Sequence, residues 1–148
     1  MLKIGILASG QLGLRTLQQI TADHAVRFVL TDRRSSDIIQ FCDEQSLPVF
    51  AGNPRSGRGL NFVRDLPVDV IASINYLFLI EQDLIDFPNQ LAFNLHGSLL
   101  PKYRGRTPHV WAIINDEEQV GITAHCITTE CDAGEIIQQI VVPIESDD

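Results

Sequence analysis

Apolar residues in the first third of the chain alternate between short continuous runs and stretches with helical spacing. Continuous runs are typical of buried strands, whereas recurrence every three or four residues is typical of amphipathic helices. In chain order the pattern predicts a strand at residues 2–8 (LKIGILA), a helix carrying Leu12, Leu14, Leu17 and Ile20, a strand at residues 26–31 (VRFVLT), a helix at residues 38–45 and a brief strand at residues 48–50. The turn Ser9-Gly10 separates the first two elements.

Strands also dominate the remainder of the chain. Residues 51–59 (AGNPRSGRG) are too rich in Gly, Pro and Ser for a regular element and predict an exposed loop. Residues 68–74 (VDVIASI) are almost continuously apolar, as expected for a parallel strand covered on both faces. After them the pattern predicts a strand at residues 91–95, a short helix at residues 108–115, and two strands at residues 121–127 and 136–142 that pair as an antiparallel edge.

Strands that alternate with helical connections indicate an α/β fold. We therefore expect an open, mostly parallel twisted sheet with helices on both faces and an antiparallel edge. No internal repeat or linker divides the chain, so we expect one domain over residues 1–148. In such sheets, ligands bind at the carboxyl ends of the strands.

Charge and hydropathy narrow the classes of function. The 11 basic and 19 acidic residues give a net charge of -8, which disfavours a broad surface for nucleic acid. No run of 18 apolar residues is present, and the chain begins directly with a predicted strand, so we expect a cytoplasmic protein without a membrane contact. The sequence leaves the oligomeric state open, a homodimer included.

The three cysteines do not form the paired spacing of a disulfide framework or zinc ribbon, so we interpret Cys42, Cys126 and Cys131 as reduced thiols. His125 lies beside Cys126 and could suggest a metal site. Ligand number and spacing both fall short of a structural zinc site, so we predict that no metal is bound.

The densest group of chemically unusual residues is the stretch 94–105 (NLHGSLLPKYRG), which follows a predicted strand. Residues two apart on a strand face the same side, so Asn94 and His96 are predicted to project into one pocket. An amide N–H beside an imidazole can stabilise a carbonyl oxygen that gains negative charge during attack. Each residue taken alone also has a structural interpretation. Asn94 could form a turn at the end of the strand, and His96 could be a core histidine with its hydrogen bonds satisfied. Asp132 could form the turn before Ala133-Gly134.

Residues 93–105 (FNLHGSLLPKYRG), followed by residues 131–137 (CDAGEII), resemble the formyltransferase family. Its signature is Asn-x-His on a strand, a Ser-Leu-Leu-Pro loop and a downstream Asp, and the likeness spans nearly the whole chain. The resemblance implies the Rossmann-like fold of the family's catalytic domain, with 10-formyltetrahydrofolate as the formyl donor. It also implies that Asn94 and His96 contact the formyl oxygen and that Asp132 completes a catalytic trio.

The implied chemistry is direct attack of an amine on the formyl carbon, without a metal or a covalent enzyme intermediate. A carboxylate at Asp132 would favour the imidazolium form of His96 and could relay a proton from the amine. The resemblance also implies a cis bond before Pro101. It places the pterin between two segments, which are Leu77, Phe78, Leu79 and Ile80 on one side and Ile127, Thr128, Thr129, Glu130 and Cys131 on the other.

The resemblance implies that the acceptor is an amine on a small molecule. The residues expected to contact it are Ser9, Gly10, Ser98, Lys102, Arg104 and Arg106. The alternatives are that Ser98 shapes its loop and that the three cations form a solvated patch. Residues 102–111 (KYRGRTPHVW) resemble sugar N-formyltransferases, which favours an amino-deoxysugar nucleotide. A missing Gly-x-Gly-Ser-Asn loop disfavours glycinamide ribonucleotide, and the acidic charge disfavours methionyl-tRNA. Formyltetrahydrofolate hydrolysis is a further alternative.

Two functions of other classes compete with formyl transfer. Residues 8–13 (ASGQLG) and Asp32 imitate part of a dinucleotide-binding fingerprint, which suggests a nicotinamide dinucleotide-binding module. This alternative leaves the Asn94 cluster unexplained. The chain also stops at Asp148 without the further helix or acceptor domain of the family. A non-catalytic folate-binding domain is therefore the other alternative.

Overall fold

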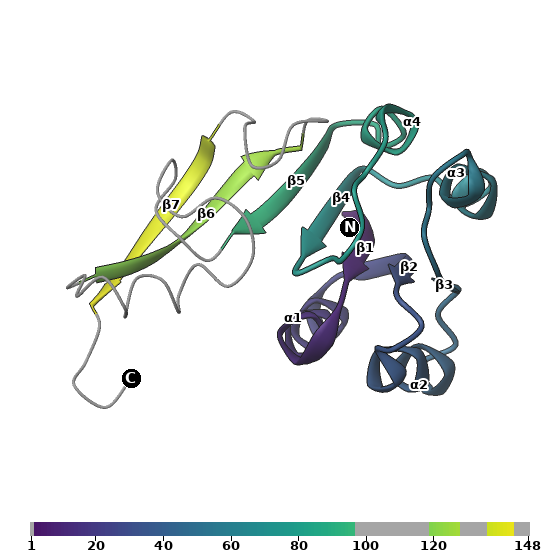
Figure 1. Ribbon diagram of the computed structural model, residues 1–148, viewed down its shortest axis with the longest axis horizontal. Coiled ribbons are helices and arrows are strands. Elements are labelled where there is room, and N and C mark those ends of the chain that lie inside the picture. Colours follow the sequence, from purple (N-terminus) through teal and green to yellow (C-terminus); the bar gives the residue numbers. More distant parts are fainter. Residues whose placement is uncertain (1, 97–118, 128–135, 144–148) are drawn as a thin grey trace.

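A single seven-stranded sheet organises the chain (Figure 1). The computed structural model describes residues 2–96, 119–127 and 136–143, with side chains described for residues 2–95 and 124–127. The strands are β1 (Lys3–Ala8), β2 (Ala25–Thr31), β3 (Val49–Ala51), β4 (Val70–Ile74), β5 (Leu91–His96), β6 (Gln119–Cys126) and β7 (Ile136–Pro143). The described helices are α1 (Gly10–Asp23), α2 (Ser36–Glu44), α3 (Arg58–Val63) and α4 (Gln82–Ile85).

The strand order is β3-β2-β1-β4-β5-β6-β7. Strands β1 to β5 are parallel, whereas β6 pairs antiparallel with both β5 and β7. The chain first builds outward from β1 through β2 to β3 and then returns to place β4 on the other side of β1. The order of strands therefore reverses between β1 and β4, which is the position where open α/β sheets bind ligands.

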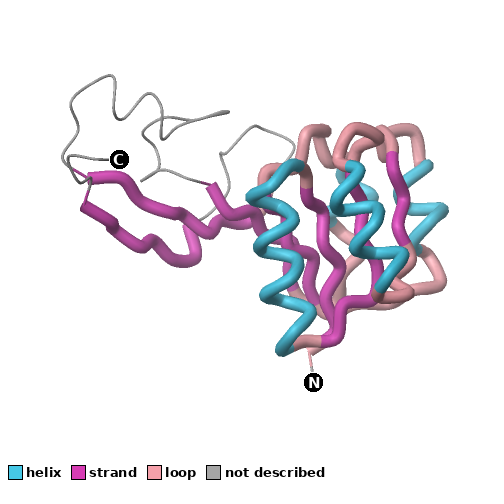
Figure 2. The backbone as a smooth tube through the Cα atoms, turned by 90° about the horizontal axis from the view of Figure 1, so that it is seen from below, coloured by secondary structure: helices cyan, strands magenta, loops and turns pink. Residues whose placement is uncertain are grey.

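Two hydrophobic clusters cover opposite faces of the sheet. Side chains alternate along each strand, so Ile4 and Ile6 face α1 and α2, whereas Leu7 faces α3 and α4. Figure 2 shows the helices on both sides of the parallel strands, with β6 and β7 extending past them. Strand β4 is buried along its whole length, as its continuous apolar sequence predicts.

Gly5 is required by the close approach of an aromatic ring. Gly5 and Phe28 are paired residues on β1 and β2, and the Phe28 ring is fully buried. A Cβ atom on Gly5 would overlap the ring, coming within 2.5 Å of Cε1. Phe28 also packs against Phe87, with ring centroids 6.3 Å apart, so the ring has neighbours on its other side. The missing side chain at Gly5 is thus a packing requirement of the sheet.

The α/β class and the mostly parallel sheet with an antiparallel edge are confirmed, and every predicted strand is present within two residues at each end. The prediction of an exposed loop at residues 51–59 is partly wrong. Pro54 and Gly59 are buried, and α3 begins at Arg58. Helices α3 and α4 are not evident in the sequence pattern, and the helix predicted at residues 108–115 lies outside the described residues. None of the helices in the described part of the chain is long and apolar enough to cross a membrane.

Candidate functional site

The carboxyl ends of β1, β2 and β4 are tied together by hydrogen bonds around Ser9. The backbone N–H of Leu77 donates to Ser9 Oγ over 3.3 Å, and Asn75 Nδ2 donates to the Ser9 carbonyl over 2.9 Å. The N–H of Gly10 donates to Ser35 Oγ over 3.0 Å. Ser9 is only 2% exposed, so its hydroxyl serves these internal bonds. Contact of Ser9 and Gly10 with a substrate stays a prediction.

Asp32 is the acceptor at the centre of this arrangement. Its Oδ1 accepts from Ser35 Oγ over 2.6 Å and its Oδ2 accepts from the backbone N–H of Arg34 over 3.0 Å. Burial alone raises the pKa of the carboxyl, but the hydrogen bonds from Ser35, Ser9 and Arg34 outweigh it and hold the pKa below its usual value. Asp32, which in the sequence imitated part of a dinucleotide-binding fingerprint, therefore organises the loop after β2.

The lowered pKa makes Asp32 a source of stability that acid removes. Its contribution is present above the ordinary carboxyl pKa of 3.8 and is lost as the pH falls below that value towards the lowered pKa. We expect Asp32→Asn to be less stable than the parent near neutral pH, with a difference that shrinks in acid. Urea unfolding at a series of pH values measures this. Asp43→Asn, at an exposed position, serves as the control, and a difference that is constant with pH would contradict the assignment.

Asn94 lies on β5 near its carboxyl end, where the sequence analysis placed it. It pairs with Ser73 on β4 and with His125 on β6. Its amide Nδ2 lies 3.3 Å from His125 Nε2, and His125 Nδ1 lies 3.0 Å from the carbonyl oxygen of Cys126. Asn94 is half-buried and His125 is 3% exposed. A polar pair thus sits at the junction of the parallel sheet and its antiparallel edge.

His96 is the last residue of β5 and pairs with Thr123 of β6. Its backbone position, two residues after Asn94 on the same strand, is the one that the sequence predicts. Asp132 lies outside the described residues, so the predicted convergence of the three groups stays a prediction. The same holds for the cis bond before Pro101 and for the remaining residues predicted in the loops, namely Ser98, Lys102, Arg104, Arg106, Thr128, Thr129, Glu130 and Cys131.

The two segments predicted to hold the pterin meet at one cluster of the core. Ile80, after β4, and Ile127, after β6, both pack against the apolar cluster beneath α3 and α4. The N–H of Ile127 donates to the carbonyl of Ala92 over 3.0 Å, which extends the β5–β6 pairing. In the segment after β4, Leu77 and Leu79 are 38% and 77% exposed. This segment therefore offers apolar side chains at the ligand-binding edge of the sheet.

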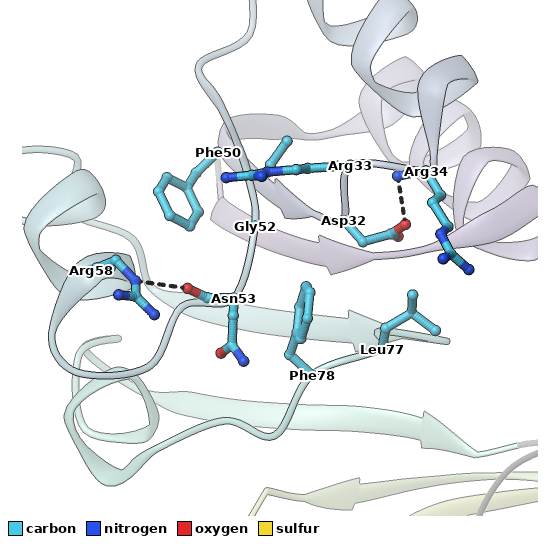
Figure 3. A pocket seen from close by; sticks show the side chains of 10 residues that line it. Asp32, Arg33, Arg34, Phe50, Gly52, Asn53, Arg58, Leu77 and Phe78 are labelled. Atoms are coloured by element: carbon cyan, nitrogen blue, oxygen red, sulfur yellow. Dashed lines mark hydrogen bonds between the residues drawn. The ribbon is translucent and has the colours of Figure 1, made fainter.

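A pocket of about 720 Å³ opens beside that segment (Figure 3). It lies at the carboxyl ends of β2 and β3, with the rings of Phe50 and Phe78 and the guanidinium of Arg58 around it. Arg58 Nε donates to the carbonyl of Asn53 over 3.3 Å, which holds the arginine on the rim. The lining residues are Asp32, Arg33, Arg34, Phe50, Ala51, Gly52, Asn53, Arg58, Leu77 and Phe78. Three cations and two aromatic rings suit a ligand that is aromatic and anionic.

Nothing in the described ranges gathers three or more His, Cys, Asp or Glu side chains into a metal site. His125 and Cys126 were candidate ligands in the sequence, but the His125 ring faces Asn94 and its own backbone. Cys42 is buried in the core, where burial raises the pKa of its thiol to about 11. This thiol is thus held in its unreactive, protonated form.

Sequence reasoning missed two features of the site. The partnership of His125 with Asn94 depends on the antiparallel register of β5 and β6, which no local pattern reveals. The pocket joins residues from three separate loops, and the only sequence signal was the clustering of Arg and Phe beside predicted strand ends.

The chain is similar in sequence to known formyl transferases. A family model described as formyl transferase matches residues 16–148. The bifunctional polymyxin resistance protein ArnA of Wigglesworthia glossinidia brevipalpis is 34% identical over 148 residues, which cover 98% of this chain. The chain spans 22% of the length of that relative.

Solved structures share the fold. The phosphoribosylglycinamide formyltransferase of Bacillus halodurans superimposes with a TM-score of 0.83 at 24% identity, covering 99% of this chain and 82% of that one. The structure of WlaRD, a sugar 3N-formyl transferase in the presence of dTDP and 5-N-formyl-THF, gives a TM-score of 0.72 at 23% identity. It covers 98% of this chain and 53% of that one.

Proposed function

Because the chain belongs to the formyl transferase family, we propose that it moves a formyl group from 10-formyltetrahydrofolate to the amine of a small acceptor. The family match covers residues 16–148, which include Asn94, His96 and Asp132. The nicotinamide-binding alternative loses its main support, since Asp32 already accepts hydrogen bonds from its own loop.

The observation that carries the proposal is the placement of Asn94. The half-buried amide of Asn94 lies near the carboxyl end of β5. Strand β5 is the neighbour of β4, and the strand order reverses between β4 and β1. Open α/β sheets bind their ligands at this edge. An amide held there by a buried partner is a preorganised donor, and preorganised donors stabilise the charge that develops on a carbonyl oxygen in the transition state.

The chemistry follows from the three groups. The amine nitrogen attacks the formyl carbon, the carbonyl oxygen becomes negative, and the C–N bond to the donor then breaks. Asn94 donates a hydrogen bond to that oxygen, and an imidazolium at His96 adds positive charge beside it. Asp132 favours the charged imidazole and accepts the proton that the amine loses, directly or through water. The proton finally passes to the departing donor nitrogen, so the sum of charges is unchanged.

The pocket beside Phe78 supports a place for the tail of the donor. Strands β2 and β5 are three positions apart in the sheet, so their ends are separated by about 14 Å. A folate consists of a pterin, an aminobenzoyl ring and a glutamate in a row, and it can reach across this distance. With the pterin against the segment after β4, at the carboxyl ends of the strands, the aminobenzoyl ring would meet Phe50 and Phe78. The glutamate carboxylates would then meet arginines of the pocket.

For the acceptor we propose an amino-deoxysugar nucleotide. The support is the sequence of residues 102–111, with its three cations, and the 34% identity to ArnA, whose full chain is much longer than this one. Arginine and lysine side chains in that stretch suit a diphosphate. Glycinamide ribonucleotide remains the runner-up acceptor because a phosphoribosylglycinamide formyltransferase shares the fold.

Incubation with 10-formyltetrahydrofolate and a panel of amino nucleotide-sugars tests the proposal. We expect one panel member to gain the mass of a single formyl group, with one equivalent of tetrahydrofolate released per product. Glycinamide ribonucleotide and a reaction without acceptor belong in the same panel. Release of tetrahydrofolate without an acceptor would favour hydrolysis of the donor, and donor binding without release would favour a non-catalytic domain. No binding and no product would refute the proposed function.

A further inference from the structure

We propose that His125 is a positioning residue, which fixes the orientation of the Asn94 amide so that one of its N–H groups faces the reacting carbonyl. The role in catalysis rests on the proposed function. The orientation of the amide follows from the geometry alone.

The first step concerns the proton on the imidazole of His125. Nδ1 lies 3.0 Å from the carbonyl oxygen of Cys126. A carbonyl oxygen can only accept a hydrogen bond, so Nδ1 must carry a hydrogen and donate it. On the other side of the ring, Nε2 lies 3.3 Å from Asn94 Nδ2, and an amide NH₂ group can only donate a hydrogen bond. These two contacts together make Nδ1 the donor and Nε2 the acceptor of the His125 ring.

The second step concerns the amide of Asn94. Its Nδ2 lies 3.3 Å from His125 Nε2, so the amide donates one N–H to this lone pair. If the amide were turned over, its Oδ1 would face the same lone pair and two acceptors would repel each other. A ring with its hydrogen on Nδ1 and a lone pair on Nε2 thus excludes the reversed orientation. The amide oxygen must point away from His125, and the second N–H of Nδ2 is directed away from the ring as well.

The strand pairing makes this arrangement rigid. Asn94 and His125 are directly opposite on β5 and β6, where cross-strand side chains stand close together on one face. His125 is 3% exposed, so water has little access to the imidazole. A donor that is oriented before the substrate arrives needs no reorganisation in the transition state. Orientation by His125 should therefore act on turnover rather than on donor affinity.

Two substitutions at His125 separate orientation from packing. His125→Phe keeps a ring of similar shape but has no acceptor, whereas His125→Gln loses the ring and keeps an oxygen that can accept the Asn94 N–H. We expect His125→Phe to lower kcat about 10- to 100-fold with the KM for the donor nearly unchanged. We expect His125→Gln to retain most of the parent kcat. His24→Phe makes the same replacement at an exposed histidine after α1, and as the matched control it should keep the parent kcat.

The opposite ranking, with His125→Phe near the parent and His125→Gln impaired, would overturn the proposal, because packing would then be what matters. Equal kcat in all three proteins would overturn it too. Long-range ¹H–¹⁵N spectra of the parent protein provide a readout that is independent of activity. They should show His125 protonated on Nδ1 and not on Nε2. A proton on Nε2 would overturn the inference about His125, whether or not the protein transfers formyl groups. If the tautomer is as expected but no formyl transfer is detected, the result counts against the proposed function alone.

Discussion

Turnover is expected to fall about 100- to 1000-fold in His96→Ala, and by a similar factor in Asp132→Asn, while the folate donor is bound almost as tightly as before. In the proposed mechanism, both side chains act on charge that exists only in the transition state. Removal of the imidazole deletes a positive group beside the developing oxyanion. Asn at position 132 keeps the shape of the side chain but cannot favour the imidazolium or accept a proton from the amine.

Steady-state kinetics with saturating acceptor, together with a titration of the folate, measure both effects. His24→Ala and Asp65→Asn are suitable controls, because both residues are exposed and lie away from the carboxyl ends of the strands. The double variant should be little worse than either single variant, since the two residues act as a unit. Near-normal turnover in either single variant, with the fold intact, would remove that residue from the mechanism.

Gly5→Ala is expected to destabilise the fold by about 3 kcal/mol, at the upper end of the range for overpacked cores. The added methyl would overlap the ring of Phe28, which is fully buried and packs against Phe87. Because Gly5 and Phe28 pair across β1 and β2, a shift of the ring would also disturb the centre of the parallel sheet. This loss of stability should exceed the gain that alanine normally brings over glycine through its higher strand propensity.

Chemical denaturation of the parent and of Gly5→Ala measures this free energy of unfolding. The double variant Gly5→Ala with Phe28→Leu identifies the cause, since the smaller side chain leaves room for the methyl. We expect it to be more stable than the sum of the two single effects predicts. Strict additivity, or a Gly5→Ala protein as stable as the parent, would show that the ring does not limit this position.

Local patterns predicted the strands well because burial imposes a continuous apolar run on them. Strand β4 is the clearest case, since its sequence VIASI is buried at every position. The short helices α3 and α4 were not predicted, because they lack a recognisable apolar pattern. Helix α3 contains Gly59 and Asn61 within six residues, and α4 has only four residues, so neither shows a helical period. Tertiary contacts hold them, as with Val63 and Leu84 in the core.

The sequence predicted the part of the candidate site that lies at the end of a predicted strand. Asn94 was singled out because an amide at the carboxyl end of a predicted strand is informative, and its position on β5 agrees with that prediction. The donor and the catalytic trio came from the family resemblance, and the role of the trio stays a prediction. His125 was not found in this role, because its contact with Asn94 is set by the register of two strands that are about thirty residues apart in the chain. Asp32 suggested a dinucleotide-binding module in the sequence, whereas in the fold it accepts hydrogen bonds from Ser35 and Arg34.

The most direct measurement of the central claim is a single-turnover transfer from an isotope-labelled formyl donor, performed on the parent protein and on Asn94→Ala with the protein in excess over the donor and with saturating acceptor. If the Asn94 amide stabilises the oxygen of the formyl group under attack, label will arrive on the acceptor amine in the parent protein and about 100- to 1000-fold more slowly in the variant. Label that arrives equally fast in both proteins would contradict the account.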